Sequence, residues 1–330
     1  MKDFLNRDDE GLILHHWDTD GLSAAALLLR ESSKSFNLFT PTIGNYLLDE
    51  KDRARIDKID PDFTIVVDMA LPKDSIDFLK EFGDVYIFDH HLQDRHDVKL
   101  HHNPIIDGDS PKEYPSASWV VNEYLGNDSN LLSILGAFGD REEKLKDNKI
   151  AYPTIKETLN KLNSDFDSLL KCAYYLDTNY KIGDRDAVSD YARYLKEVKT
   201  PEDILGRTEL KENYEKLNDA IEMEVNREKE NLSENIVLLE MKSPYNIIST
   251  VTRRIAWADE EKIIIVSNCE YMEDNCQIYI RGPIPDSEKI INHLKDKGYS
   301  AGGKSDVIGM VIPKEDNEET LDEVLEMLKL

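Results

Sequence analysis

Short apolar segments alternate with amphipathic segments in the first part of the chain. Residues 11–16, 63–68 and 84–89 are short and mostly apolar, as buried strands are. Residues 22–32 and 73–82 instead show the periodicity of amphipathic helices. This alternation predicts an α/β fold with a mostly parallel, doubly wound sheet that helices cover on both faces.

The middle of the chain is predicted to be helical. Residues 116–125 and 129–138 form two predicted helices, and residues 154–198 continue as a helical region rich in tyrosine. Residues 209–232 are strongly charged and offer few core positions. We therefore interpret that segment as a connecting helix between two domains.

A second, smaller α/β unit begins near residue 234. Its predicted strands are residues 236–240, 262–268, 276–281 and 306–312, and its predicted helices are residues 246–258, 286–297 and 318–329. We therefore expect three parts: a larger domain over residues 1–205, a helical linker over 206–233 and the smaller domain over 234–330.

Composition and charge narrow the class of protein. The chain has 330 residues, of which 40% are hydrophobic, so it can form two domains with real cores. Its formal net charge of −26 argues against a protein that coats nucleic acid through bulk positive charge. A focused site is still compatible with this charge, because divalent metal ions can supply positive charge locally.

The expected location is cytoplasmic, without a membrane partner. The sequence has no apolar run of transmembrane length, and its polar, acidic N-terminus does not match a secretory signal. Three cysteines without such a signal favour a reducing compartment. Cys269 and Cys276 could face each other across a hairpin, but ordinary core or strand residues are the favoured interpretation.

Polar side chains gather where the predicted strands end. The first strand leads into His16, Asp18 and Asp20, and the second ends in Asp68. The third ends in Asp89, which His90 and His91 follow, and Asp140 lies beyond a later helix. Because ligands collect beyond the carboxyl ends of parallel strands, we expect these side chains to form one site.

The residue types in this cluster favour metal binding. Carboxylates held close together repel each other unless a positive charge is shared, and mixed imidazole and carboxylate ligands suit manganese, iron or zinc. The candidate ligands are His16, Asp18, Asp20, Asp68, His90 and Asp140. Six ligands are more than one ion with an open position needs. Two ions about 3.5–4 Å apart that share one carboxylate would use them all, and such pairs catalyse phosphoester hydrolysis.

The ordered set of motifs resembles the DHH phosphoesterase superfamily, which includes RecJ exonucleases and oligoribonucleases called nanoRNases. The matching motifs are His-Trp-Asp-Thr-Asp-Gly (16–21), Val-Val-Asp (66–68), Asp-His-His (89–91), His-His-Asn-Pro (101–104) and Gly-Asp-Arg (139–141). The resemblance implies a metal-dependent phosphodiesterase with two Mn²⁺ ions, for which Mg²⁺ or Co²⁺ could substitute.

The resemblance also implies a role for each residue of the cluster. His16, Asp18 and Asp68 would bind one metal, and Asp20, Asp68, His90 and Asp140 the other, so that Asp68 bridges the two. His91 would face the scissile phosphate, and Asp89 would orient a histidine from outside the ligand set. The catalytic residues implied are therefore Asp68, Asp89 and His91.

The smaller unit resembles the DHH-associated C-terminal domain. The matching features are Tyr-Ile-Arg-Gly at 279–282 and Ala-Gly-Gly-Lys-Ser-Asp-Val-Ile-Gly at 301–309. The resemblance implies substrate contacts from Arg281, Gly302, Gly303 and Lys304, besides His91. The family usually has Gly-Gly-His, so Lys304 keeps a cation but lacks the planar donor and stacking face of histidine.

Two further cations adjoin this predicted substrate site. Arg253 and Arg254 are neighbours on a predicted helix, where adjacent side chains point in different directions. At most one of them is therefore expected to contribute.

Three functions fit these observations. The favoured one is a Mn²⁺-dependent exonuclease on single-stranded DNA or RNA, similar to compact archaeal RecJ-like proteins, with replication or repair proteins as partners. The alternative is a nanoRNase-like hydrolase of very short oligonucleotides, cyclic dinucleotides or a nucleotide phosphate. The acidic composition favours it, since long single strands usually need a basic, aromatic-lined groove. A replisome scaffold is the third, but the intact ligand set argues against a purely structural role.

Overall fold

The computed structural model describes residues 2–329, except for the side chain of Lys304. The chain divides into two compact units. Unit 1 comprises the described residues up to Tyr180 together with Asp184–Tyr214, and unit 2 comprises Lys181–Gly183 and the described residues from Glu215 onward. The domain limits predicted at residues 205 and 233 stay a prediction.

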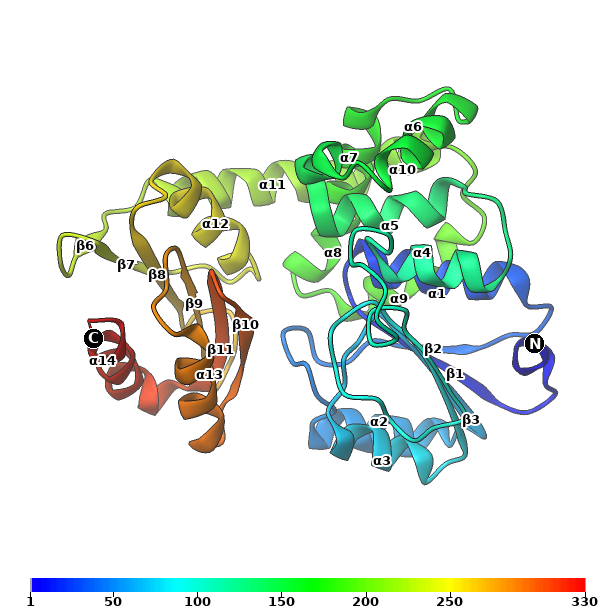
Figure 1. Ribbon diagram of the computed structural model, residues 1–330, viewed down its shortest axis with the longest axis horizontal. Helices are drawn as coiled ribbons and strands as arrows, with labels where there is room; N and C mark the ends of the chain where they lie inside the picture. Colours follow the sequence, from blue (N-terminus) through cyan, green and yellow to red (C-terminus); the bar gives the residue numbers. More distant parts are fainter. Residues whose placement is uncertain (1, 330) are drawn as a thin grey trace. The chain divides into compact units, whose positions relative to one another are not determined.

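Unit 1 contains a five-stranded, all-parallel sheet, which confirms the predicted fold class (Figure 1). Its strand order is β2-β1-β3-β4-β5. The strands are β1 (Gly11–His15), β2 (Asn37–Phe39), β3 (Phe63–Val67), β4 (Asp84–Phe88) and β5 (Leu100–His102). β2 and β5 have only three residues each, too few to show a pattern in the sequence.

Helices cover both faces of this sheet (Figure 1). α1 (Thr19–Glu31) and α4 (Ala117–Tyr124) lie on one face, and α2 (Glu50–Ile59) and α3 (Lys73–Lys80) lie on the other. α1 also contacts α5 (Leu131–Arg141) and α9 (Arg185–Leu195). Every residue of β1 and β3 is buried, as expected for central strands of a doubly covered sheet.

The region 154–198 is helical as predicted, but it is broken into short pieces. These are α6 (Tyr152–Lys161), α7 (Phe166–Leu176), α8 (Thr178–Lys181) and α9, and α10 (Pro201–Leu205) follows. Asn163 and Gly183 have φ angles of 51° and 84°. Left-handed residues of this kind end helices, so the region forms a packed cluster of helices.

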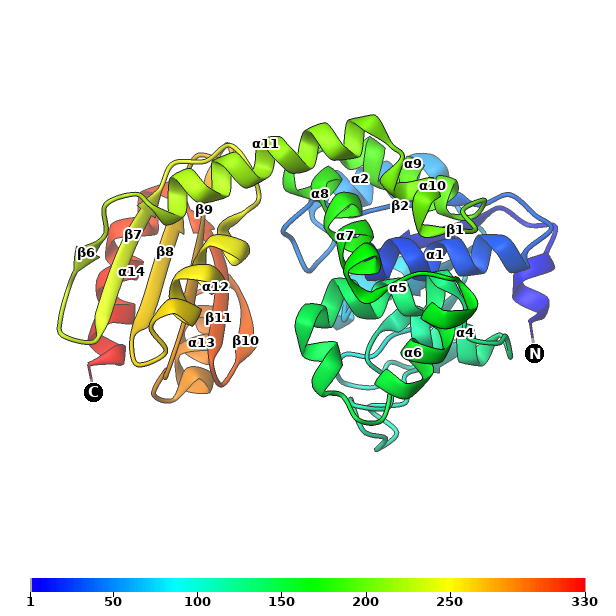
Figure 2. The same ribbon diagram turned by 90° about the horizontal axis from the view of Figure 1, so that it is seen from above.

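The predicted helix 209–232 is too long at its C-terminal end. α11 (Thr208–Val225), the long helix labelled in Figure 2, contributes residues to both units. Beyond it, Glu230 and Asn231 form β6 and pair with Leu238 and Val237. Pairing at the edge of a sheet therefore overrides the helical composition of this charged segment.

Unit 2 contains a mixed six-stranded sheet in the order β10-β11-β9-β8-β7-β6. Only β7 and β8 pair in parallel; the other pairings are antiparallel. Besides β6 (Glu230–Asn231), its strands are β7 (Ile236–Met241), β8 (Ile263–Asn268), β9 (Asn275–Arg281), β10 (Ser300–Lys304) and β11 (Val307–Pro313).

Two hydrophobic cores lie on opposite faces of this sheet. On one face, α12 (Ile248–Ala258) packs Val251 and Ile255 against β7 and β8. On the other, α13 (Ser287–Asp296) and α14 (Asn317–Leu328) pack against alternate residues of β8, β9 and β11. Consecutive side chains of a strand therefore serve different cores, which is the period of two that the sequence displays.

The disulfide between Cys269 and Cys276 corrects the favoured interpretation of these residues as ordinary core or strand positions. Asn268 pairs with Gln277 in the antiparallel β8–β9 ladder, so the next residues outward, Cys269 and Cys276, face each other. Cys172 is the third cysteine and is buried. A sequence alone does not provide this register.

Membrane crossing requires a long, apolar helix. Within residues 2–329, none of the helices meets both requirements.

Candidate metal centre

Three neighbouring strands place the candidate residues side by side. β1, β3 and β4 end at His15, Val67 and Phe88, and the next residues, His16, Asp68 and Asp89, continue the backbone ladder. The donors are the amides of these three residues, with N···O distances to Val67, Phe88 and His102 of 3.3, 3.0 and 3.2 Å. The strand order reverses between β1 and β3, so the residues lie at the switch point where ligands bind in such sheets.

The first ligand group joins the ends of β1 and β3. His16 Nδ1 lies 2.8 Å from Asp18 Oδ2 and 3.6 Å from Asp68 Oδ2. Asp68 is almost fully buried and has a φ of 59°, a left-handed conformation that is costly for any residue except glycine. Local strain of this kind often accompanies functional residues, and here it occurs at the centre of the cluster.

Two more groups surround His90, and one of them shares Asp68 with the first. His90 Nε2 lies 3.1 Å from Asp140 Oδ2, 3.8 Å from Asp20 Oδ2 and 3.6 Å from Asp68 Oδ1. His91 Nδ1 lies 3.8 Å from Asp68 Oδ1. The three sets whose potential ligand atoms all lie within 4.8 Å of one another are His16–Asp18–Asp68, Asp20–His90–Asp140 and Asp68–His90–His91. The structure thus brings together all the candidate ligands that the sequence predicts.

The start of α1 fixes one of the carboxylates. Asp18 is the N-cap of the helix, and its Oδ1 accepts hydrogen bonds from the amides of Asp20 and Gly21, both at 3.1 Å. The other oxygen, Oδ2, therefore faces His16. One side chain both begins the helix and joins the ligand cluster.

Asp20 is held from the neighbouring helices. Its oxygens accept hydrogen bonds from the amides of Ala117 and Ser118 at the start of α4, at 2.5 and 2.8 Å. The positive end of a helix stabilises a buried carboxylate in this position. Gly136 of α5 leaves the space, because a Cβ there would lie 2.0 Å from Asp20 Oδ1. The sequence analysis did not assign Ala117, Ser118 or Gly136 to the site, and only the packing of α4 and α5 on α1 identifies them.

Asp89 orients His91 through hydrogen bonds. Its Oδ1 accepts hydrogen bonds from the amides of His90 and His91 and from the ring Nδ1 of His91, the last at 2.8 Å. Gln93 donates to the other oxygen, and Asn103 donates to the backbone carbonyl of His91 at 2.8 Å. The His91 side chain is 49% exposed, whereas Asp89 is fully buried. Asp89 is therefore a supporting residue, and His91 is accessible to a substrate.

Burial, neighbouring charges or both raise the pKa values of three residues in the cluster. Burial, with the nearby Asp20, Asp18 and Asp140 charges, raises the pKa of Asp68 well above its ordinary value. Burial and the charge of Asp140 raise the pKa of Asp20 to about 6. Burial alone would lower the pKa of His90, but its contact with Asp140 outweighs burial and raises the pKa to about 9. These raised pKa values reflect negative charges held close together, and a bound cation would reduce their repulsion.

The structure itself fits a metal ion at this position. Five buried atoms of the cluster have no hydrogen-bond partner of good geometry within residues 2–329: both ring nitrogens of His16, both ring nitrogens of His90, and Asp68 Oδ1. Buried polar atoms are rarely left unsatisfied without a reason such as an ion. Imidazole nitrogens mixed with carboxylate oxygens are a donor set that suits Mn²⁺ or another transition metal.

His15, which directly precedes the first motif, is not part of this set. It is fully buried, and its Nδ1 contacts the carbonyl of His16 at 2.8 Å. Burial lowers its pKa to about 4, so it is neutral at neutral pH. Its role is structural.

The predicted substrate residues of unit 2 lie on the edge strand β10 and at the end of the interior strand β9. Arg281 ends β9, and its guanidinium lies 3.5 Å from Asp306 Oδ2. Gly302 and Gly303 are exposed in β10, and a Cβ on Gly303 would lie 2.0 Å from the Val307 carbonyl, which explains the glycine there. Lys304 ends β10, but its side chain lies outside the described residues.

The two arginines of α12 diverge, as helix geometry predicts. The guanidinium carbon of Arg253 lies 5.4 Å from the Trp257 ring centroid, whereas Arg254 forms an ion pair with Glu222. Only Arg253 is therefore near Arg281, whose guanidinium carbon lies 5.9 Å from the same ring.

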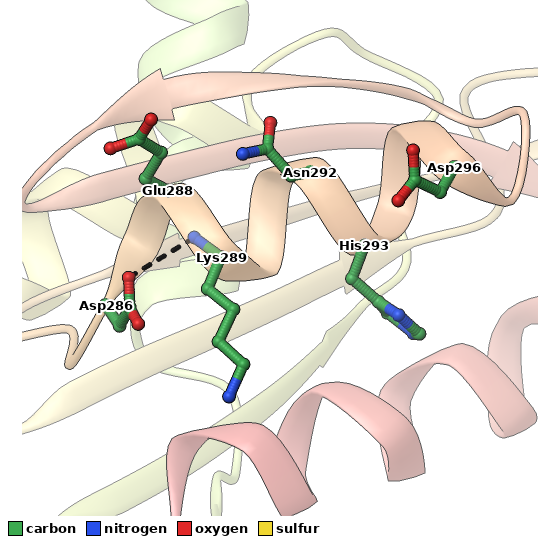
Figure 3. A pocket seen from close by; sticks show the side chains of 6 residues that line it. All are labelled: Asp286, Glu288, Lys289, Asn292, His293 and Asp296. Atoms are coloured by element: carbon green, nitrogen blue, oxygen red, sulfur yellow. Dashed lines mark hydrogen bonds between the residues drawn. The ribbon is translucent and has the colours of Figure 1, made fainter.

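A shallow pocket on unit 2 contains none of the predicted site residues. It lies along α13 and is lined by Asp286, Glu288, Lys289, Asn292, His293 and Asp296 (Figure 3). Its side chains project from a single helix over an open surface, and three of the six are acidic. We assign no chemistry to it.

Comparison with protein-family models and with curated proteins gives no match. Solved structures do match. RecJ from Thermus thermophilus, in complex with Mn²⁺, aligns with a TM-score of 0.68 at 16% identity, over 96% of this chain and 51% of RecJ. The chain thus spans about half the length of that protein.

Two further structures align over most of both chains. The DHH domain of a protein described as a member of a ribosomal protein family has a TM-score of 0.66 at 16% identity, over 98% of this chain and 87% of that one. A manganese-bound exonuclease RecJ has a TM-score of 0.64 at 17% identity, over 98% and 91%. These likenesses confirm that the chain has the fold of the DHH phosphoesterase superfamily.

Proposed function

We propose that this protein is a phosphodiesterase that uses two metal ions. The observation that carries the proposal is that the three ligand groups are linked. The group Asp68–His90–His91 shares Asp68 with one of the other groups and His90 with the other. His16, Asp18 and Asp68 would hold one ion, and Asp20, Asp68, His90 and Asp140 the other. Two Mn²⁺ ions, or Mg²⁺ or Co²⁺ in their place, would supply an activated water and neutralise the charge on the phosphoryl oxygens.

The protein's own residues would orient the substrate against these ions. Asp89 engages Nδ1 of His91, so the Nε2 edge of the exposed ring is the one to meet a phosphoryl oxygen. The raised pKa of His91, to which the Asp89 charge contributes against burial, favours the protonated ring as a hydrogen-bond donor. In unit 2, Arg281, the exposed Gly302 and Gly303, and Lys304 would contact phosphates or sugars of the substrate.

Single-stranded DNA or RNA, digested from an end, is the substrate we favour. The support is the shared fold with the manganese-bound structure that is named exonuclease RecJ. Very short oligonucleotides are the second candidate, and the net charge of −26 favours them, because an acidic surface repels long polyanions.

Hydrolysis of 5′-labelled single strands from 2 to about 40 nucleotides, with Mn²⁺, tests both the chemistry and the substrate length. We expect Asp68→Ala to lower turnover by more than about a hundredfold, beyond the 10–100-fold typical of losing a partner outside the ligand set. Asp74→Ala, which removes an exposed carboxylate on α3, is the matched control and should match the parent. Activity of Asp68→Ala within a few-fold of the parent would contradict the two-metal proposal.

The product ladder separates the two substrates. Cutting that continues on long strands indicates an exonuclease and gives its direction. Cutting confined to the shortest strands indicates the second candidate.

A further inference from the structure

Trp257 stands out on the surface of unit 2. It lies near the end of α12 and is 48% exposed, whereas Trp17 is almost fully buried. Single exposed apolar side chains are ordinary on protein surfaces, so Trp257 is of interest because of the charged groups around it.

Two guanidinium groups from different elements approach this ring. Arg253 and Trp257 are four residues apart on α12 and therefore share one side of the helix. Arg281 comes from β9, whose alternate residues Gln277, Tyr279 and Arg281 face away from the core under α13. The distances of 5.4 and 5.9 Å from the guanidinium carbons to the ring centroid are within the range of cation–π contacts.

Arg253, Trp257 and Arg281 lie in two segments without acidic residues, although Asp259, Glu260 and Glu261 follow directly after α12. The chain has 67 acidic residues among 330, yet residues 241–258 contain three cations and no Asp or Glu. Residues 275–285 also contain no acidic residue. The nearest acidic partner of Arg281 is Asp306 at 3.5 Å, the outer limit of a hydrogen bond, so a phosphate could compete for the guanidinium.

We propose that Trp257, together with Arg253 and Arg281, forms a platform on which a base of a single-stranded nucleic acid stacks. Aromatic rings bind bases through their faces, whatever the base, and adjacent arginines bind the phosphates. No aromatic-lined basic groove is visible in the sequence, because Arg281 joins Arg253 and Trp257 only when α12 packs on the sheet. The nature of the ligand rests on the proposed function, but the platform itself needs no metal.

Binding in the presence of EDTA tests this inference without hydrolysis. The probe is a 5′-fluorescein-labelled dA₁₂, whose anisotropy is measured with the full chain at several salt concentrations. Base stacking on an aromatic side chain is typically worth about tenfold or more in affinity, so Trp257→Ala should raise the Kd about tenfold, and Trp257→Phe should raise it less. Arg253→Ala should weaken binding and reduce the salt dependence.

Arg254→Ala is the matched control, because Arg254 neighbours Arg253 on α12 but pairs with Glu222. It should leave the Kd within twofold of the parent. A 12-residue abasic strand separates stacking from charge, since the Trp257→Ala effect should disappear on it. Equal effects of Trp257→Ala on both strands, an unchanged Kd for dA₁₂, or no binding of dA₁₂ by the parent would overturn the platform, and a protein-docking surface would then explain Trp257 better.

The outcomes for the platform and for the proposed function are independent. Binding that depends on Trp257, without Mn²⁺-supported hydrolysis, would support the platform and contradict the proposed phosphodiesterase activity. Hydrolysis that is lost in Asp68→Ala, together with binding that does not change in Trp257→Ala, would support the phosphodiesterase activity and contradict the platform.

Discussion

At the scale of single residues, glycines next to the cluster leave the space that the ligands occupy. Gly136 and Gly21 both lie where a Cβ would collide: with Asp20 Oδ1 at 2.0 Å and with the His16 carbonyl at 2.4 Å. The first collision is the more informative, because Gly136 belongs to a different helix from Asp20. The position of that carboxylate depends on how closely α5 approaches α1.

Gly136→Ala should displace Asp20 and reduce both stability and activity. Overpacking typically costs about 1–3 kcal/mol, which outweighs the roughly 1 kcal/mol that alanine gains over glycine within a helix. We expect a lower free energy of unfolding in urea and a fall of about tenfold or more in Mn²⁺-supported turnover.

Gly139→Ala on the same helix provides the comparison. Its Cβ would meet Thr19 Cβ at 3.0 Å, a milder contact that involves no ligand. It should therefore affect activity less. Equal activity of Gly136→Ala and the parent would show that Asp20 is not held as described.

At the scale of elements, the ends of β1, β3 and β4 explain why the sequence alone could group the candidate ligands. Strand ends are visible as apolar runs that stop at Asp or His, and the parallel arrangement makes those ends meet. The elements that support the ligands are less visible. The contacts of Asp20 with the amides of α4 depend on helix packing, and no residue type marks a backbone donor.

The shortest and most glycine-rich strands were also missed. β2 and β5 have three residues each, and β10 contains Gly302 and Gly303, which lower strand propensity. β10 nevertheless forms, because Gly302 and Gly303 allow close pairing with Gly309 and Ile308 of β11. Such segments become strands because of long-range pairing, which local composition hardly reveals.

The link between β8 and β9 gives a prediction at this scale. The Cys269–Cys276 disulfide closes a loop with a sequence separation of seven. Loop-closure entropy for so short a loop gives about 2–3 kcal/mol of stabilisation. Urea unfolding with and without a reductant should differ by this amount in the parent and should not differ in a Cys269→Ser, Cys276→Ser double variant.

Cys172 provides an internal control for thiol counting. Burial raises the pKa of this thiol to about 12, so it should not react until the protein unfolds. Two reactive thiols in the native, non-reduced protein would contradict the disulfide.

At the scale of the whole molecule, the cluster makes stability depend on pH. The pKa of Asp20 is raised from 3.8 to about 6, and that of His90 from 6.5 to about 9, so at these two residues the folded, metal-free protein binds more protons than the unfolded chain. The stability contributed by Asp20 is lost as pH rises from about 4 to 6, and that contributed by His90 is lost from about 6.5 to 9. Asp18 and Asp89 have lowered pKa values because their histidine neighbours outweigh burial, so they act in the opposite direction only at strongly acidic pH.

Burial lowers the pKa values of His15 and His101 to about 4, which opposes the Asp20 contribution below about pH 6.5, so we expect the melting temperature in EDTA to fall between about pH 6.5 and 9. Mn²⁺ should reverse this trend, because its ligands must lose their protons to bind, so the rise in melting temperature on adding Mn²⁺ should grow with pH. Thermal melts of the parent and of Asp20→Asn, with Mn²⁺ and with EDTA, measure both trends. The asparagine variant, which removes one of the charges that raise the pKa of His90, should have a flatter profile in EDTA, and a parent more stable at about pH 9 than at about pH 6.5 in EDTA would contradict this expectation.

The central claim is that one cluster binds two metal ions through a shared Asp68. Equilibrium dialysis of the metal-free protein against Mn²⁺ counts the bound ions most directly, with Asp68→Ala alongside the parent. The account predicts two ions per chain in the parent and at most one, held more weakly, in Asp68→Ala. One ion or none in the parent, or two in the variant at unchanged affinity, would contradict it.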